Sequence, residues 1–498
     1  MFRALAVLTC LVLPACFATA EPAQGPGRPA GFFPPGGLPF IPVGPQPGAV
    51  PVNSEGWRSV VQSFGAPMSG PQTKLVEDIV AELSRAAGSV APRGGYRATL
   101  LDTSVVNAFA IGDGNVFMTR QLLACMNSED ELIGVMGHEV GHVIGGHTPF
   151  TGAARAGQAG GDRLLGVFVP ALRGAALVAS TAVVQTFGRS QEHSADVAGV
   201  KFLADLGRDP QAMGRALAVL DAHGKLQQKL YGGGQAPRAL DYWLSSHPLH
   251  AERVGLVRLA ASMAPRAPAR TQRSPAAFVR ELDGMVIDDG PEHGIVNGTV
   301  FRHPTMKLGL DAAPGLRLIN SPQALLVRAS KGSAATLKSV AGGGTPVERF
   351  LAAWVKSLPE QIKPPTPEPL DHNGIQGASG SVLWNTDEGS VQISMWLYAW
   401  TENQSFIYVA FDPAGAQAAE HTTTARSFRR LTDAEAAAVK LRRISVVDIQ
   451  PGDTVASLSE RMAYPDFRED RFRLINGLFS GQSLPKSGPI KLVIWSPQ

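Results

Sequence analysis

One segment, residues 127–142, constrains the fold of this chain more than any other, because its side chains fit together only on a helix. Ser128 and Glu131 have the spacing of a capping box, which predicts that the helix begins here. His138 and His142 lie on one helical face, one turn apart, so both imidazoles can reach a single tetrahedral metal ion. Glu139 is rotated by about 100° from His138 and can address a water at the metal without ligating it. The pattern predicts a Zn²⁺ site with Glu139 as general base in a hydrolysis.

A third metal ligand has two candidates. In one known zinc-site pattern, the metzincin pattern, a histidine stands six residues after the second histidine, with a glycine at the third position. Gly145 fits that pattern after His142, but the sixth residue is Thr148, and His147 comes one residue early. This mismatch argues against the metzincin arrangement.

The better candidate lies fifty residues after His142, where Glu192 and Asp196 stand four apart on a second expected helix. Glu192 can ligate the metal there, while Asp196 hydrogen-bonds a ligand histidine from behind. We therefore predict a gluzincin centre, in which His138, His142 and Glu192 hold one Zn²⁺ per chain and the fourth position is left to water.

These residues resemble the metallopeptidase family that includes HtpX, the CAAX prenyl protease, mitochondrial Oma and BepA. The matching elements cover most of residues 60–260: His138-Glu139-x-x-His142, Glu192-x-x-Ala195-Asp196, Asn107-Ala108-Phe109-Ala110, Asp209-Pro210 with Met213, and Ser246-His247-Pro248 with Arg253. The resemblance implies a zinc endopeptidase. It also implies a late histidine near the metal, His247, which either donates to the oxyanion or occupies the open zinc position as a switch. Arg253 would orient a carboxylate or a substrate carbonyl.

Asn107, Ala108, Phe109 and Ala110 are expected on a strand, because two apolar runs flank the turn sequence Gly112–Asn115. In zinc peptidases an edge strand near the metal binds extended substrate through its main chain, which gives these four residues a substrate-binding role. The alternative is a hairpin that only packs.

The N-terminus predicts export. Arg3, the apolar run Ala4–Leu13 and the small residues Ala18 and Ala20 form a secretory signal, residues 1–20, which directs the chain to the periplasm. The alternative is a lipid anchor at Cys16. The Pro- and Gly-rich residues 21–56 are expected to form a disordered tether.

One further apolar stretch, Leu164 to Phe187, is interrupted by Pro170 and Arg173. A charge near the middle of a membrane span is costly, so we interpret this stretch as buried or resting on a membrane surface, a peripheral membrane contact. HtpX and the prenyl protease are multi-pass membrane proteins, so the resemblance is closest to soluble periplasmic members of the BepA type.

Three folded units are expected, in an α+β fold. Residues 57–264 would form a mainly helical peptidase domain with a short β-hairpin, and residues 275–440 an α+β domain of unknown role. Residues 444–498 resemble a LysM module of βααβ order, which binds peptidoglycan or serves only as a structural cap. Cys125, the one cysteine outside the signal, is expected to be a small core residue, and the net charge of +3 gives no reason to expect a nucleic-acid partner.

We therefore expect a periplasmic zinc endopeptidase of misfolded or unassembled cell-envelope proteins. Two alternatives stay open. One is a wall-associated binding protein or chaperone with latent peptidase activity, and the other is a peptidase of peptidoglycan peptides.

Overall fold

The computed structural model describes residues 48–498 apart from 52, 149–186, 232–242, 244–245, 249–250, 266, 269–271, 323, 330–331, 387–388, 414 and 480. The expected signal, most of the expected tether and nearly all of the apolar stretch from Leu164 lie outside the described residues. In the described part of the chain, no helix combines the length and the apolarity needed to cross a bilayer.

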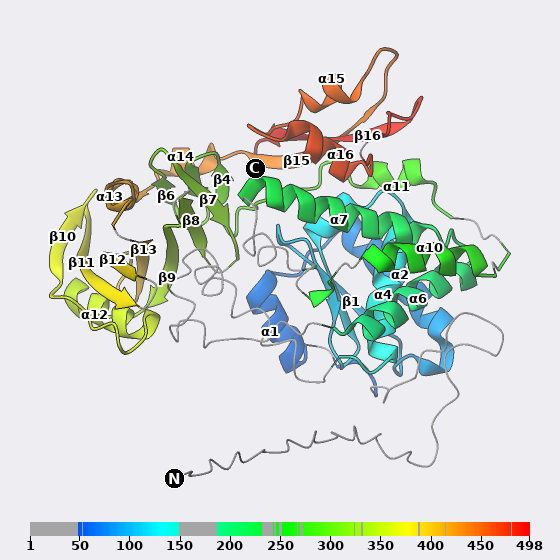
Figure 1. Ribbon diagram of the computed structural model, residues 1–498, viewed down its shortest axis with the longest axis horizontal. Coiled ribbons are helices and arrows are strands. Elements are labelled where there is room, and N and C mark those ends of the chain that lie inside the picture. The colour runs from blue at the N-terminus through cyan, green and yellow to red at the C-terminus, as the bar shows by residue number, and fades with distance from the viewer. Residues whose placement is uncertain are drawn as a thin grey trace, which may run out of the picture.

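The N-terminal region is mainly helical, with one small sheet (Figure 1). Its elements are α1 (Glu55–Phe64), α2 (Pro71–Ala87), the 3-10 turn η1 (Gly88–Val90), β1 (Arg97–Leu101), β2 (Ala108–Ala110), β3 (Asn115–Thr119), α3 (Arg120–Cys125), α4 (Glu129–Ile144), α6 (Arg189–Asp205), α7 (Ala212–Tyr231) and α10 (Ala251–Met263).

The small sheet has the order β1-β3-β2, so β2 lies at an edge. The expected hairpin is present, because β2 and β3 pair antiparallel around Gly112–Asn115. Strand β1, which pairs parallel with β3, was not predicted. It is a five-residue strand with a short buried run, and periodicity alone cannot distinguish such a run from helix.

Helices α4 and α6 pack at very close range because small residues line their contact. A Cβ added to Gly141 would lie 2.6 Å from the Cβ of Ala198, and one added to Gly199 would lie 2.7 Å from the carbonyl oxygen of Gly134. No larger side chain fits at these positions without moving the helices apart. This close approach brings the first turns of α6 against the histidine face of α4.

The start of α4 differs slightly from the expectation. Ser128 caps the helix by accepting from the N–H of Glu131. The Glu131 carboxylate, however, accepts from the N–H of Asn127 and not from that of Ser128. The predicted capping box is therefore only half formed, and its acidic member satisfies the residue one position earlier.

The middle of the chain is dominated by sheets. Its elements are α11 (Pro275–Glu281), β4 (Ile295–Asn297), β5 (Val300–His303), β6 (Leu308–Asp311), β7 (Leu316–Asn320), β8 (Leu325–Ala329), β9 (Ala334–Ala341), α12 (Pro346–Ser357), β10 (Glu368–His372), β11 (Ile375–Thr386), β12 (Gly389–Ala399), β13 (Gln404–Pro413), α13 (Ala418–Arg426), β14 (Arg429–Arg430) and α14 (Asp433–Ala437). The seven-stranded antiparallel sheet runs β10-β11-β12-β13-β9-β8-β7, and the four-stranded sheet runs β14-β6-β5-β4.

Two cores hold this region together. Helix α12 packs its buried Phe350 and Trp354 on one face of the large sheet, and the small sheet and α13 cover the other face. Helix α14 ends at Ala437, and a strand begins at Leu441.

The C-terminal region consists of β15 (Leu441–Asp448), α15 (Val455–Ser459), α16 (Arg468–Ile475) and β16 (Pro489–Ser496), with β15 and β16 paired antiparallel. The βααβ order is the expected one, and the likeness to LysM stays a prediction. The mixed α+β class is confirmed, with helices in the peptidase region and sheets further along the chain.

The C-terminal region shares one hydrophobic core with the N-terminal region, to which Phe472 and Leu492 contribute beside Leu122 and Leu123. The buried ammonium of Lys491 donates to the carbonyls of Ala124 (2.9 Å) and Met126 (2.8 Å), directly before α4. Figure 1 shows this region lying along α7. The predicted boundaries at 264, 275 and 444 are not tested by this packing, but the core runs across them.

Cys125 is buried in this shared core, and burial raises the pKa of its thiol to about 12. Such a thiol is inert near neutral pH.

Candidate metal centre

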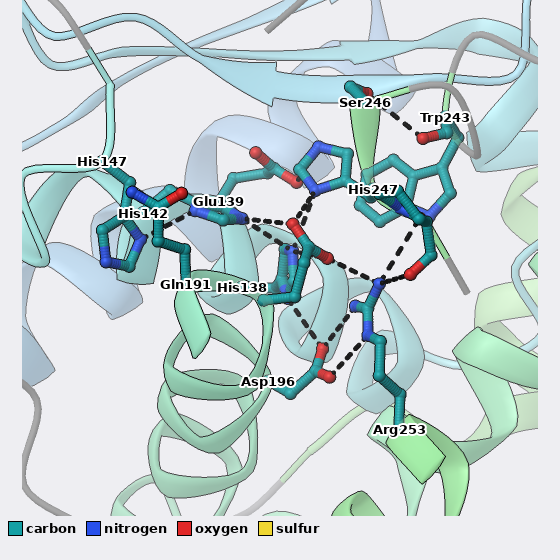
Figure 2. A network of polar contacts seen from close by, with 12 residues as sticks. His138, Glu139, His142, His147, Gln191, Asp196, Trp243, Ser246, His247 and Arg253 are labelled. Carbon is teal, nitrogen blue, oxygen red and sulfur yellow. Dashed lines mark hydrogen bonds and ion pairs between the residues drawn. The ribbon is translucent and has the colours of Figure 1, made fainter. Parts of the chain in front are cut away.

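Four side chains from three separate segments converge at one buried point, and Figure 2 labels the three histidines among them. They are His138 and His142 from α4, Glu192 from α6, and His247, and one ligand atom of each lies within 4.8 Å of the others. All four are at most 1% exposed. The four side chains are therefore buried.

The separations between these atoms fit a tetrahedral ion. His138 Nε2 lies 3.1 Å from His142 Nε2 and 3.3 Å from His247 Nδ1, and Glu192 Oε1 lies 3.3 Å from His142 Nε2 and 2.9 Å from His247 Nδ1. Ligands about 2.0–2.1 Å from a zinc ion at tetrahedral angles stand about 3.3 Å apart. The donor set matches zinc, with three imidazoles and one carboxylate.

The charges point to a divalent cation as well. Glu139, Glu192 and Asp196 are buried carboxylates, and Arg253 is the buried guanidinium among them. With neutral imidazoles, the ionised Glu192 and Asp196 exceed the charge of Arg253 by one negative charge, and ionisation of Glu139 raises that excess to two. Because buried unpaired charges are strongly unfavourable, a Zn²⁺ ion is the natural partner for this set of residues.

Asp196 and Arg253 hold the ligands from behind (Figure 2). Asp196 Oδ1 lies 2.9 Å from Nδ1 of His138, which leaves Nε2 of that ring to face the centre. Arg253 donates to both oxygens of Asp196, at 2.8 and 2.7 Å, and its Nη1 lies 2.5 Å from Glu192 Oε2. Of the two roles expected for Arg253, its position matches the orientation of carboxylates.

These contacts, together with burial, also set the protonation states of Glu192, Asp196 and His142. Burial opposes ionisation of Glu192, but His247, His142 and His138 together hold its pKa well below the usual range. Burial likewise opposes ionisation of Asp196, and the Arg253 ion pair outweighs it, so the pKa of Asp196 is lowered. Burial lowers the pKa of His142 well below its usual value. Glu192 and Asp196 are thus ionised and His142 is neutral, which are the protonation states that metal binding requires.

Glu139 lies beside the centre rather than in its ligand set. Burial, assisted by the charge of Glu192, raises the pKa of Glu139 well above its usual range. Its Oε1 has no hydrogen-bond partner among the described residues and stands 3.7 Å from His247 Nε2. The N–H of Ala110 on β2 hydrogen-bonds the same carboxylate. A buried carboxylate with a raised pKa and a free oxygen is suited to exchange a proton.

The edge of β2 faces this carboxylate. The Asn107 carbonyl accepts from the N–H of Thr119, and the N–H of Ile111 donates to Asn115, so odd-numbered residues bond inward to β3. Because antiparallel ladders alternate, Ala108 and Ala110 direct their main-chain groups outward. Asn107 also has a buried Oδ1 without a partner in the described part of the chain. Phe109 instead stacks on Phe117 and packs beside Phe64.

Two aromatic residues that the sequence interpretation missed cover the centre. Phe187 stacks on the ring of His142, with centroids 3.9 Å apart, and Trp243 stacks on His247 at 4.3 Å. The N–H of His247 bonds the carbonyl of Trp243, so the two share one helical turn. The four-residue spacing of Trp243 and His247 was the available signal. His147 was set aside in the metzincin comparison, yet its Nδ1 lies 2.9 Å from Nδ1 of His142.

Comparison with known proteins assigns the region that contains these residues. Residues 71–260 match Peptidase family M48. Two of the curated relatives, Beta-barrel assembly-enhancing proteases of Escherichia coli (strain K12) and Shigella flexneri, are each 30% identical over 174 residues, which is 32% of this chain and 33% of theirs. The match thus spans about a third of the relatives' length.

Among solved structures, a crystal structure from Bacteroides thetaiotaomicron covers 41% of this chain and 88% of its own, at 10% identity and a TM-score of 0.23. A TM-score this low supports no argument about the fold. The HExxH helix, the converging ligand set and the family match all fall in one continuous region, and on these grounds the chain carries a metallopeptidase domain of Peptidase family M48.

Proposed function

We propose that this chain is an exported zinc endopeptidase that hydrolyses polypeptides of the cell envelope, with misfolded or unassembled envelope proteins as its substrates. The observation that carries the proposal is the position of Glu139, next to a complete set of metal ligands and to the open edge of β2. The substrate class and the periplasmic location rest on the sequence resemblance, on the N-terminal signal pattern and on the name of the relatives.

Residues His138, His142 and Glu192 would hold the zinc ion, which when bound supplies Lewis acidity that makes water nucleophilic near neutral pH. Glu139 takes the proton of the attacking water, and its raised pKa suits it to pass that proton to the leaving amine. The outward main-chain groups of Ala108 and the outward carbonyl of Ala110 pair with an extended substrate and place its carbonyl beside Glu139. Pairing through the main chain makes sequence specificity broad.

The test combines zinc content with casein cleavage for the wild type and for Glu139→Gln. We expect the variant to keep one zinc per chain and to lose about 10²–10⁴-fold in kcat, because the isosteric amide cannot take up a proton. Cleavage that survives in Glu139→Gln would overturn the mechanism. Zinc-loaded wild type without any cleavage would instead favour a binding protein or chaperone with latent peptidase activity.

We further propose that His247 occupies the fourth ligand position in the resting enzyme and so holds it closed. This rests on its Nδ1, which stands at ligand-to-ligand distance from His138 and Glu192, and on Trp243 stacked behind it. His247→Ala should raise casein hydrolysis several-fold while zinc stays bound. A fall in kcat would instead assign His247 to stabilisation of the oxyanion.

A further inference from the structure

A second recess lies away from the metal centre, where the three regions of the molecule meet. This junction cleft has a volume of about 520 Å³ and is lined by Val106, Leu230, Asp288, Leu318, Tyr464 and Arg471, among others. Its size is within the range of about 300–1,000 Å³ that ligand sites occupy. None of the metal ligands lines it. It is therefore a separate candidate for binding.

One wall of the cleft is an unpaired strand edge. Strand β7 ends the seven-stranded sheet and pairs only with β8, and all five of its residues line the cleft. The N–H of Ser321 bonds the carbonyl of Ala324 at the hairpin, so Ile319 and Arg317 are the residues that bond to β8. Leu318 and Asn320 direct their main-chain groups the other way, into the cleft, and no described residue pairs with those groups.

The edges of β4 and β10, by contrast, are protected. Strand β4 also borders the cleft, but its outward N–H, that of Val296, donates to Asp289 (2.9 Å), and the Val296 carbonyl accepts from Arg442 (3.4 Å). Strand β10, at the far end of the large sheet, is largely exposed and carries Pro369 and charged residues, which discourage pairing. The edge of β7 has neither kind of protection. Leu318, on this edge, is nevertheless only 7% exposed.

The charges in the cleft suit a neutral ligand. Three arginines line it, and each lies 3.8–3.9 Å from an aspartate: Arg317 and Arg471 from Asp466, and Arg442 from Asp288. With Asp289, three aspartates line the cleft beside the three arginines, so no net charge remains to attract a strongly charged polymer. Arg471 keeps a buried Nε–H without a hydrogen-bond partner in the described chain, so a donor for a carbonyl is available. The uncharged main-chain amides of a peptide therefore suit this lining.

The lining of the cleft lies next to β2 along the chain. Ser104, Val105 and Val106 line it and lead directly into Asn107 and β2. Ala110 is four residues along the chain from Val106, a path of about 13 Å in a strand. An extended chain lying along β2 therefore reaches the cleft within a few residues.

We propose that the junction cleft binds an extended, uncharged segment of a polypeptide substrate as an added strand on β7, distant from the bond that is cut. The identity of this occupant rests on the proposed peptidase function. The chain's own residues 21–54 are poor candidates, because their many prolines lack the N–H groups that strand pairing needs. The cleft would hold long substrates and leave short ones unaffected.

Two variants test this site in the full-length Glu139→Gln protein, which cannot cut the probe. Thr299→Trp places a bulky group at an exposed position on the rim. Leu318→Pro removes the outward N–H of β7 without breaking a bond to β8. Val355→Trp, an exposed position on α12, is the matched control. The probe is a fluorescein-labelled decapeptide of alternating Val and Thr, alongside the same peptide N-methylated at every second residue.

Both cleft variants should weaken binding of the plain decapeptide at least fivefold, the control should not, and the N-methylated peptide should bind poorly to all proteins. In the otherwise wild-type enzyme, Thr299→Trp should raise KM for casein about fivefold without changing kcat or the hydrolysis of a tetrapeptide. Unchanged decapeptide binding in Thr299→Trp would overturn the proposal, even if Leu318→Pro misfolds. Wild-type enzyme that binds the decapeptide but cleaves neither substrate would overturn the peptidase function and leave the cleft standing.

Discussion

Two buried polar clusters in this molecule each contain histidine, and they differ in whether every hydrogen-bonding atom has a partner. The metal centre of the N-terminal region contains three histidines and excess carboxylate charge. The sheet region contains His421, whose Nε2 lies 2.6 Å from Ser333 Oγ and whose Nδ1 lies 2.7 Å from Tyr408 Oη, all at most 1% exposed.

The second cluster is complete as a neutral network. Ser333 donates to the carbonyl of Phe411 (3.2 Å), so its oxygen accepts from Nε2–H of His421, and Tyr408 donates to Nδ1. No side-chain polar atom of Ser333, His421 or Tyr408 lacks a partner in the described part of the chain. In the metal centre, by contrast, Glu139 Oε1 and His247 Nε2 have no hydrogen-bond partner among the described residues. Unbalanced charge and unmatched acceptors distinguish a site from a structural network.

The largest effect is expected when the charge balance of the metal centre is changed. Glu192→Gln removes one of the carboxylates and should lower zinc affinity at least about 100-fold, since a ligand should matter no less than its supporting residues. Zinc content and the rise in melting temperature on zinc addition measure this. Ser333→Ala is the control and should leave zinc binding unchanged. Full zinc occupancy in Glu192→Gln would mean that the charge argument is wrong.

A smaller loss is expected from the residue behind His138. Asp196→Asn keeps the shape but weakens the bonds to His138 and Arg253, and zinc affinity should fall about 10–100-fold. Competition with a chelator of known affinity measures the change. An unchanged affinity would show that the His138 tautomer does not depend on Asp196.

The sheet cluster should make stability depend on pH. Burial lowers the pKa of His421 to about 4, against about 6.5 in the unfolded chain. Because the unfolded state takes up the proton first, the contribution of His421 is complete above pH 6.5 and is lost as the pH falls towards 4, by up to about 3 kcal/mol. Denaturant unfolding of wild type and His421→Gln measures it, and the difference should shrink over this range. A constant difference would contradict the neutral network.

The smallest effect is expected from one hydroxyl. Tyr408→Phe leaves Nδ1 of His421 without its donor and should cost about 1–3 kcal/mol in the free energy of unfolding. Zinc content and casein cleavage should not change, because the two clusters are independent. Loss of activity without loss of stability would show that this network communicates with the metal centre.

The sequence predicted the local parts of this molecule well. Helix α4 and the β2–β3 hairpin follow from capping, turn residues and apolar spacing, which act between residues close in the chain. Strand β1 was missed because a short buried run has no distinctive period. The half-formed capping box shows the same limit for a single side chain. The Glu131 carboxylate bonds the N–H of Asn127, and the capping-box spacing had predicted the N–H of Ser128.

What the sequence by itself determined is therefore the pair His138 and His142 with Glu139 between them, because a helical repeat fixes which side chains share a face. The tertiary structure alone decided that His247 stands at ligand distance from Glu192, that Lys491 ties the C-terminal region to the start of α4, and that the edge of β7 borders a cleft. These contacts join residues tens to hundreds of positions apart. Such pairs depend on close packing between elements, as the contact of Gly141 with Ala198 shows. The periodicity of a single helix or strand does not indicate which of its faces will contact which other element.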